Sequence, residues 1–384
     1  MASRNGNVKC LMSHFRNRKN LLVRTYKAVI PEPKGSFVLV HGNCCHFRAE
    51  FTAYNMNWYM EKYKIGLPNA DDVVRGELDA MYPRKAATLR ADPNAKFPHY
   101  STLDGKDFFD VSPRFIYEGS FVQKLNDLGY DVYGLDLQSH GMSEGMYGRR
   151  NYYVCLDEII EDVIQFVDIV KRGKFDDTEE KYDAEKIGQP SSIGKVYVGG
   201  LSMGGNIVLR LAELASIYKR GGQHFIDGVL SMAPMTDLLD YVEQAGKKVQ
   251  LLVSKFIALF YPSCTLFLEE DRVVNSINGF FRKNDPHVFN FPQCYGVVSS
   301  LFTATHKLKD DIGLYPKDLP TLLIHAVDDP VCTISGSREL ANNYMKDYNL
   351  KYVELDGKVH CITSAMYNER LLPALKEWLR ELEK

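Results

Sequence analysis

Six short apolar runs recur along the sequence. They occupy residues 36–41, 130–137, 195–200, 228–233, 319–326 and 351–355. Apolar runs of this length are typical of strands that are buried on both faces, as in a parallel sheet. The chain is therefore expected to build a mostly parallel sheet.

Helical patterns lie between these runs. Apolar residues recur with the 3.6-residue period of an amphipathic helix across residues 121–128, 156–167, 207–215 and 371–379. Strand and helix in alternation predict a doubly wound α/β sheet with right-handed crossovers, and ligands then bind beyond the C-terminal strand ends. A chain of 384 residues fits one large α/β domain with insertions or two ordinary domains. We interpret residues 1–384 as a single α/β domain.

Two stretches interrupt the alternation. Residues 47–114 are rich in Asp, Pro, Asn and Tyr, and a plain loop of this length is uncommon. We expect a folded or partly mobile insertion there, after the first core strand. Residues 237–317 contain an unusually apolar helix-like run at 249–261, and we interpret this stretch as a cap over the site. The apolar run either lies buried within the cap or rests on a membrane surface.

Composition and charge narrow the class of protein. The net charge of −2 creates no global attraction to nucleic acid or to an anionic membrane. The eight cysteines lack CxxC pairs, so neither a zinc site nor a disulfide framework is indicated, and a reduced, cytoplasmic location is expected. No apolar run is long enough to span a bilayer. The charged residues before Ile30 are all basic, as in a transit peptide. However, residues 21–26 are strand-like after a predicted hairpin turn at 17–20, so this segment is expected to belong to the fold.

The segment Gly200-Leu201-Ser202-Met203-Gly204 follows the third apolar run and precedes a helical pattern. A nucleophile on a tight strand-to-helix turn needs a strained backbone, and glycine two positions to either side removes the clashes. The five-residue pattern arises by chance in some chains, but its place between strand and helix is the context that the motif requires. We therefore predict that Ser202 is the nucleophile of a serine hydrolase, at the positive end of the helix dipole.

A serine hydroxyl is a poor nucleophile without a base. The motif predicts an acid and a base after later strands, in the order Ser, Asp, His. Asp329 follows the fifth apolar run and His360 follows the sixth. We predict that His360 takes the proton of Ser202, and that Asp329 fixes the imidazole tautomer and stabilises the imidazolium. Asp328 and Asp237 are the alternatives for the acid, and a surface histidine is the alternative role for His360.

The oxyanion hole is expected to consist of two backbone N–H groups. Met203 directly follows the nucleophile, and Asn43 lies in the turn after the first apolar run. Two cysteines follow in that turn, Cys44 and Cys45, and they are either reactive thiols or small buried residues beside the site. His46 either contacts substrate or makes a structural hydrogen bond.

These features resemble an α/β-hydrolase of the monoglyceride lipase and lysophospholipase group, most of all the lysophospholipase-like esterases of protozoan parasites, which carry long insertions. The matching pieces are His41-Gly42, DLQSHGMSEG at residues 136–145, GLSMGG at residues 200–205, Asn284-Asp285-Pro286, the Asp329 turn and His360. The resemblance extends from about Leu21 to the C-terminus. It implies an α/β-hydrolase fold with a helical cap and an esterase of monoacyl lipids, cytosolic or at a membrane surface. The sequence departs from the family at residues 43–46 and in the 47–114 insertion, so a substrate unlike a monoglyceride stays open.

The sequence thus predicts a carboxylic ester hydrolase that works through an acyl-enzyme without metal or cofactor. The expected substrate is a monoacyl lipid, either a lysophospholipid or a monoglyceride, or a related ester. Peripheral membrane contact through the cap is a further expectation, and nucleic acid is not an expected partner. A short-chain carboxylesterase, a thioesterase and an acyltransferase are alternatives. Access of water to the acyl-enzyme decides between hydrolysis and transfer to another acceptor, and the sequence does not show that access. A non-catalytic receptor with this fold would be expected to lack a triad residue, and none is missing.

Overall fold

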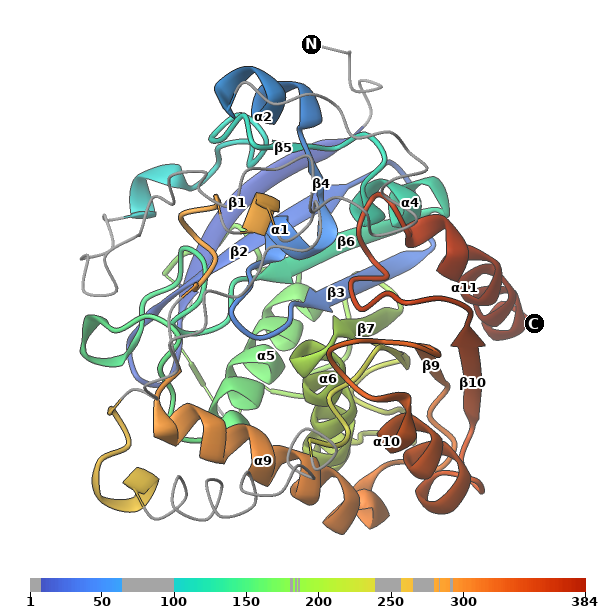
Figure 1. Ribbon diagram of the computed structural model, residues 1–384. Helices are drawn as coiled ribbons and strands as arrows, with labels where there is room; N and C mark the ends of the chain where they lie inside the picture. Colours follow the sequence, from blue (N-terminus) through green and yellow to red (C-terminus); the bar gives the residue numbers. More distant parts are fainter. Residues whose placement is uncertain are drawn as a thin grey trace.

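An eight-stranded sheet forms the centre of the computed structural model, which describes residues 8–63, 100–179, 182–183, 185, 187–238, 257–264, 280–282, 284–290 and 293–384. The strand order is β1-β2-β6-β3-β7-β8-β9-β10 (Figure 1). The strands are β1 (Lys9–Arg16), β2 (Leu22–Val29), β3 (Gly35–Val40), β6 (Tyr130–Leu135), β7 (Val196–Leu201), β8 (Gly228–Met232), β9 (Thr321–Ala326) and β10 (Leu350–Leu355).

Neighbouring strands are parallel from β6 across to β10, whereas β1 and β2 are antiparallel to their neighbours. The predicted mostly parallel sheet is therefore confirmed, and the six apolar runs are its parallel strands. The fifth strand begins at Thr321 rather than at Leu319, because Pro320 has no N–H to donate to a sheet ladder.

The N-terminal segment belongs to the sheet, as expected. β1 and β2 form an antiparallel hairpin. The turn between them is closed by the Asn17 side chain, whose Oδ1 accepts the N–H groups of Lys19 at 3.0 Å and Leu21 at 2.9 Å. Asn20 takes the left-handed conformation at φ 60°, which asparagine tolerates better than most residues.

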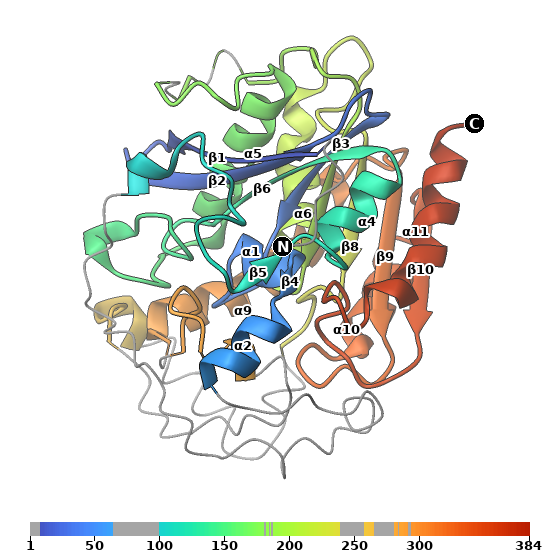
Figure 2. The same cartoon turned by 90° about the horizontal axis from the view of Figure 1, so that it is seen from above.

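Alternate residues of each strand pack on opposite faces of the sheet. Val38 and Val40 belong to the apolar cluster that contains α5 (Leu156–Lys171) and α6 (Met203–Leu214). Phe37 and Leu39 belong to the cluster that contains α4 (Phe121–Asp127) and α11 (Asn368–Leu382). Figures 1 and 2 show α5 beside α6, and α4 beside α11. The four predicted helices and their cover on both faces are confirmed, because strands buried on two sides need two layers of helix.

Four further helices gather at the C-terminal end of the parallel strands (Figure 2). The helices there are α1 (Phe47–Phe51), α2 (Met56–Tyr63), α9 (Tyr295–Asp310) and α10 (Ile334–Glu339). Single turns of 3₁₀ or π helix occupy Tyr100–Leu103, Met146–Gly148, Ala215–Tyr218, Ile312–Leu314 and Leu340–Tyr344. No helix in the described part of the chain is both long and apolar enough to cross a bilayer.

The insertion at residues 47–114 is folded at both of its ends. β4 (Ala53–Tyr54) pairs antiparallel with β5 (Phe115–Ile116), so the chain leaves and re-enters the domain at one place. Phe47 packs so closely on β6 that a Cβ on Gly134 would lie 2.1 Å from its ring. Residues 64–99 of the insertion lie outside the described residues.

The cap expected at residues 237–317 is described only in part. It includes α9, which packs against α5 and α6. A helical turn at residues 257–260 precedes it, in which Leu259 is 74% exposed and Phe260 is 60% exposed. Residues 249–256 of the apolar run lie outside the described residues.

One carboxyl of the core titrates far from its usual range. Asp162 of α5 is buried, and its Oδ2 accepts a hydrogen bond of 2.8 Å from the Asn17 side chain of the hairpin turn. Burial raises the pKa of Asp162 to about 7, more than the hydrogen bond from Asn17 lowers it. A carboxyl with a raised folded-state pKa stabilises the fold fully below the unfolded-state pKa of about 4, and this contribution is lost as the pH rises through 7.

We therefore predict that Asp162→Asn flattens the dependence of stability on pH. The wild type should lose on the order of 4 kcal/mol of unfolding free energy between about pH 4 and pH 7 that the variant keeps. Urea unfolding at several pH values measures this difference. Asp347→Asn, at an exposed position, is the control and should follow the wild type. Parallel curves for the wild type and Asp162→Asn would contradict the prediction.

Candidate active site

Ser202 lies on a sharp turn between β7 and α6. Its backbone has φ 60° and ψ −121°, a conformation in which a residue with a side chain is strained. Two hydrogen bonds of 3.0 Å hold the turn: the Ser202 N–H donates to the Met232 carbonyl, and the Met235 N–H donates to the Ser202 carbonyl. The turn thus fixes Ser202 at the C-terminal end of the sheet, where the sequence places it.

The glycines on either side of Ser202 leave no space for a side chain. A Cβ on Gly204 would lie 2.0 Å from the carbonyl oxygen of Val40, and a Cβ on Gly200 would lie 2.2 Å from the carbonyl oxygen of Gly204. Both contacts are with backbone, so no side-chain rotation can relieve them. The predicted steric reason for glycine at both positions is confirmed.

His360 and Asp329 form a hydrogen-bonded pair. His360 Nδ1 lies 2.7 Å from Asp329 Oδ2, and the two residues come from the loops that follow β10 and β9. The other carboxylate oxygen, Oδ1, accepts the N–H groups of Val331 at 2.8 Å and Cys332 at 3.1 Å. The carboxylate is therefore held in one orientation.

The Asp329 carboxyl stays ionised although it is buried. Burial alone would raise its pKa, but hydrogen bonds with His325 and His360 outweigh this effect and lower the pKa to about 2. His325 Nε2 lies 3.2 Å from Asp329 Oδ2, and His325 Nδ1 lies 2.7 Å from Ser337 Oγ. An ionised carboxylate on Nδ1 favours the tautomer of His360 that leaves Nε2 free to accept a proton.

The two alternative acids are placed differently. In the described part of the chain, Asp328 makes no hydrogen bond with His360. Asp237 Oδ2 lies 3.7 Å from Lys309 Nζ. The geometry therefore joins Asp329, and neither alternative, to His360.

The Ser202 hydroxyl points at a thiol. Its Oγ lies 3.9 Å from Cys332 Sγ, and among the described residues it makes no hydrogen bond with His360. Burial raises the pKa of Cys332 to about 12, so this thiol is neutral. Catalytic hydrogen bonds are often absent without substrate and form when it binds, so this rotamer is compatible with transfer of the proton to His360. The sequence did not single out Cys332, three residues after Asp329.

The turn after β3 lies directly against the nucleophile. A Cβ on Gly42 would lie 3.2 Å from Ser202 Cβ and 3.3 Å from Glu50 Oε2, and the Gly42 N–H donates to that same oxygen at 3.3 Å. The next residue is Asn43, and Met203 begins α6 on the other side of the serine. The two residues expected to supply the oxyanion hole thus adjoin the Ser202 turn, Asn43 after β3 and Met203 after β7.

Cys44 and Cys45 are both buried. Burial raises the pKa of Cys45 well above its ordinary value, which keeps the thiol neutral. Cys44 has φ 60°, and its carbonyl accepts the Phe289 N–H at 2.9 Å. These contacts favour the interpretation as small buried residues, in which Cys44 connects the turn to the segment around Phe289.

His46 makes a structural hydrogen bond. Its Nε2 lies 2.8 Å from Asp285 Oδ2, and both side chains are fully buried. Asp285 belongs to the Asn284-Asp285-Pro286 segment, so the pair ties the turn after β3 to a distant part of the chain. The structural alternative for His46 is therefore the supported one.

The motif at residues 136–145 anchors the same region. Asp136 is fully buried and accepts three hydrogen bonds, from Tyr26 Oη at 2.7 Å, the Phe47 N–H at 2.9 Å and the Met142 N–H at 2.8 Å. A Cβ on Gly141 would lie 2.2 Å from Asp136 Oδ2. The motif is thus a packed loop that supports the start of α1, and the structure gives it no direct contact with Ser202.

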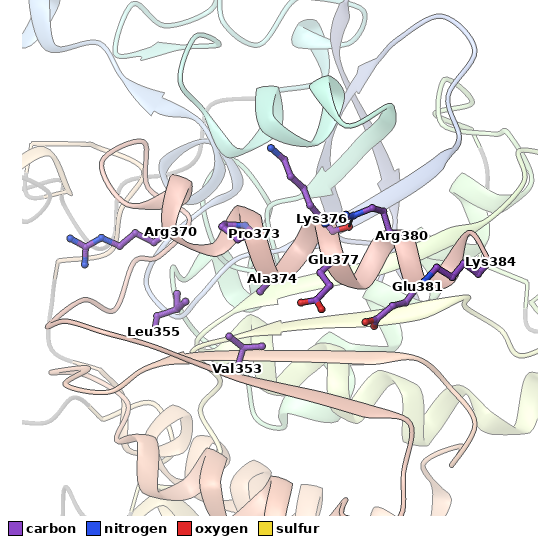
Figure 3. Close-up of a pocket in the computed structure, with 10 residues that line it drawn as sticks. All are labelled: Val353, Leu355, Arg370, Pro373, Ala374, Lys376, Glu377, Arg380, Glu381 and Lys384. Carbon is purple, nitrogen blue, oxygen red and sulfur yellow. Dashed lines mark hydrogen bonds between the residues drawn. The ribbon is translucent and has the colours of Figure 1, made fainter.

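A cavity of about 720 Å³ lies elsewhere, between β10 and α11 (Figure 3). Its walls include Val353, Arg370 and Glu377, and none of its lining residues comes from the Ser202, Asp329 or His360 turns. Within the described residues, no group of three or more His, Cys, Asp or Glu side chains is placed to bind a metal ion.

Comparisons with known proteins agree with this fold. The sheet order, its helical layers and the Ser202 turn define an α/β-hydrolase. The family model for Hydrolase_4, described as serine aminopeptidase, S33, matches residues 116–364, and the chain belongs to this family. No curated protein sequence matches the chain.

Solved structures share the fold at low sequence identity. The monoacylglycerol lipase of Paleococcus ferrophilus is 18% identical, with a TM-score of 0.54 over 97% of this chain and 99% of that one. A soluble variant of monoglyceride lipase from Saccharomyces cerevisiae, bound to a substrate analog, is 13% identical, with a TM-score of 0.55 over 96% of this chain and 94% of that one. A structure from a study of carboxylesterases of Nitrososphaera gargenis is 12% identical, with a TM-score of 0.52 over 97% of this chain and 99% of that one.

The contact between Gly204 and β3 generates a prediction. Gly204→Ala should lower the unfolding free energy by about 2 kcal/mol or more, because the new methyl group meets the Val40 carbonyl at the sheet. It should also reduce labelling of Ser202 by a fluorophosphonate probe. Thermal unfolding and labelling measure the two effects. Gly313→Ala is the control, since a Cβ there has no neighbour within 4 Å, and equal behaviour of the two variants would contradict the prediction.

Proposed function

We propose that the protein cleaves carboxylic esters through an acyl-enzyme on Ser202. The observation that carries this proposal is the pairing of His360 with an ionised Asp329 at the same end of the sheet as the strained Ser202 turn. The family and the lipase and esterase fold of the similar structures support a hydrolase of this type. The reaction needs no metal or cofactor in this scheme.

The reaction begins when the Ser202 side chain turns from Cys332 toward His360. His360 Nε2 takes the hydroxyl proton while Oγ attacks the acyl carbon, and Asp329 stabilises the imidazolium through Nδ1. The oxyanion accepts hydrogen bonds from the N–H groups of Asn43 and Met203. His360 then gives its proton to the departing alcohol, and water repeats the sequence to release the acid.

For the substrate we propose a monoacyl lipid, a lysophospholipid or a monoglyceride, or a related ester. The monoglyceride lipases among the similar structures favour this class, as does the exposed apolar turn with Leu259 and Phe260. The same turn is our candidate for peripheral contact with a membrane. Residence in the cytoplasm and a particular likeness to protozoan lysophospholipase-like esterases remain predictions of the sequence.

Labelling by a fluorophosphonate tests the nucleophile and the acid. Wild type should label, and Ser202→Ala should not. Asp329→Asn should lower kcat by about 10³–10⁴-fold, because the asparagine amide favours the wrong imidazole tautomer. If Asp329→Asn turns over normally, the acid role passes to Asp328 or Asp237, and if Ser202→Ala still labels, the assigned nucleophile is wrong.

A panel of esters tests the substrate class. We expect kcat/KM for glycerol monoesters to rise with the length of the acyl chain, from acetyl to long acyl. Each methylene buried in an apolar site contributes about 0.8 kcal/mol to binding. A preference for acetyl would leave a general esterase and remove the lipid assignment. An amino-acid anilide and an acyl thioester in the same panel separate aminopeptidase and thioesterase activity from ester hydrolysis.

A further inference from the structure

A second, smaller cavity of about 70 Å³ lies beside the proposed active site. It is lined by residues of the insertion, of the segment before Asn284 and of the loop that carries His360. Glu50 and Cys361 belong to its wall. Glu50 is hydrogen-bonded to Gly42, which touches Ser202, and Cys361 directly follows His360.

This position is the side on which the alcohol of an ester must leave. In the proposed reaction His360 protonates the departing oxygen, so the alcohol lies against the His360 loop. The cavity begins at the next residue of that loop. At roughly 10–15 Å³ per water it holds about five waters, which is room for a small polar group but not for an acyl chain.

Arg282 gives this cavity a positive charge. Its guanidinium is half-buried, and the Cys45 thiol and the Glu50 carboxylate near it raise its pKa well above the ordinary value. In the described part of the chain no carboxylate lies within ion-pair distance of it, and its side-chain hydrogen bond there is from Nη1 to Cys361 Sγ at 3.9 Å. A guanidinium stays protonated at any physiological pH and carries five N–H donors, so further hydrogen-bond acceptors are expected beside it.

Two hydroxyl groups in the same wall are also unpaired. Tyr54 Oη and Ser364 Oγ are buried, and neither has a hydrogen-bond partner among the described residues. A buried hydroxyl without a partner costs about 1–3 kcal/mol, so a ligand or water is expected to satisfy both. One oxygen of the Glu50 carboxylate, Oε2, accepts the Gly42 N–H. The Arg282 guanidinium can only donate hydrogen bonds, and the two hydroxyl groups can donate as well as accept them.

We propose that this cavity binds an oxyanion, a carboxylate or a phosphate, on the alcohol part of the ester. Arg282 is the specificity-determining residue, and Tyr54 and Ser364 donate further hydrogen bonds. The inference rests on the proposed function only in naming the group as part of a leaving alcohol. Binding of the oxyanion itself follows from the cavity.

Three small molecules that share a three-carbon skeleton test the site by calorimetry, without any turnover. Glycerol 3-phosphate and glycerate carry the two candidate oxyanions, and glycerol carries none. Wild type should bind at least one of the anions and bind glycerol at least about 10-fold more weakly. The stronger of the two anions identifies the natural group. Equal binding of glycerol, or no binding of either anion, overturns the proposal.

Substitutions at Arg282 and Glu50 should change anion binding in opposite directions. Arg282→Gln should weaken anion binding about 10- to 100-fold, and Arg282→Lys should weaken it less. Glu50→Gln removes a negative charge near the site while keeping an oxygen for Gly42, so it should strengthen anion binding several-fold. If Glu50→Gln weakens binding, the cavity selects a cation and the proposal is wrong. Arg380→Gln on the exposed face of α11 is the control for loss of charge and should bind like the wild type.

Hydrolysis separates this inference from the proposed function. The wild type should prefer the butanoyl ester of the bound anion, glycerol 3-phosphate or glycerate, to butanoyl glycerol in kcat/KM. Arg282→Gln should abolish that preference by lowering kcat/KM for the anionic ester more than for butanoyl glycerol, and the control Arg380→Gln should keep both activities and fluorophosphonate labelling. Activity that depends on Ser202 but shows no preference for the anionic ester overturns the leaving-group assignment alone. Anion binding through Arg282 without any ester cleavage overturns the proposed function and leaves the oxyanion site standing.

Discussion

The close approach of α6 to β3 is the constraint on which the rest of the site depends. The Gly204 Cα lies so near the Val40 carbonyl that a methyl group has no place there. This contact brings the first turn of α6 and the turn after β3 together, and the strained backbone of Ser202 follows from it. The strain persists because the sheet on one side and the Met232 and Met235 hydrogen bonds on the other over-determine the turn.

The turn after β3 is held from several sides at once. Leu137 donates its N–H to His41 Nε2 at 2.9 Å, Gly42 donates to Glu50, and His46 is paired with Asp285. These partners come from the loop after β6, from α1 and from the segment after residue 283, so three segments converge on one turn. A backbone N–H of this turn can stabilise an oxyanion only if it does not move when charge develops, and this convergence supplies the rigidity.

The fold was accessible from the sequence because its signals are local. Apolar runs and the 3.6-residue period located the parallel strands and the four main helices, and the glycines around Ser202 carried a steric reason that the coordinates reproduce. The pairing of Asp329 with His360 followed from strand order alone. The neighbours of these residues did not, because nothing in a linear pattern places Cys332 beside Ser202, or His325 beside Asp329.

The polar residues of the smaller cavity could not be grouped from the sequence either. Glu50, Arg282 and Ser364 lie far apart in the sequence, and each is an ordinary polar residue in its own segment. Tertiary contacts bring their segments against the His360 loop: the Thr363 hydroxyl donates to the Glu50 carbonyl at 3.0 Å, and Arg282 contacts Cys361. In the proposed reaction, acyl transfer to Ser202 uses groups that the strand order fixes, whereas the proposed choice of alcohol depends on groups that the insertion and the segment before Asn284 supply. On this proposal the reacting groups and the groups that select the alcohol lie on different parts of the chain, so a change in the second set could alter the substrate while the first set stays intact.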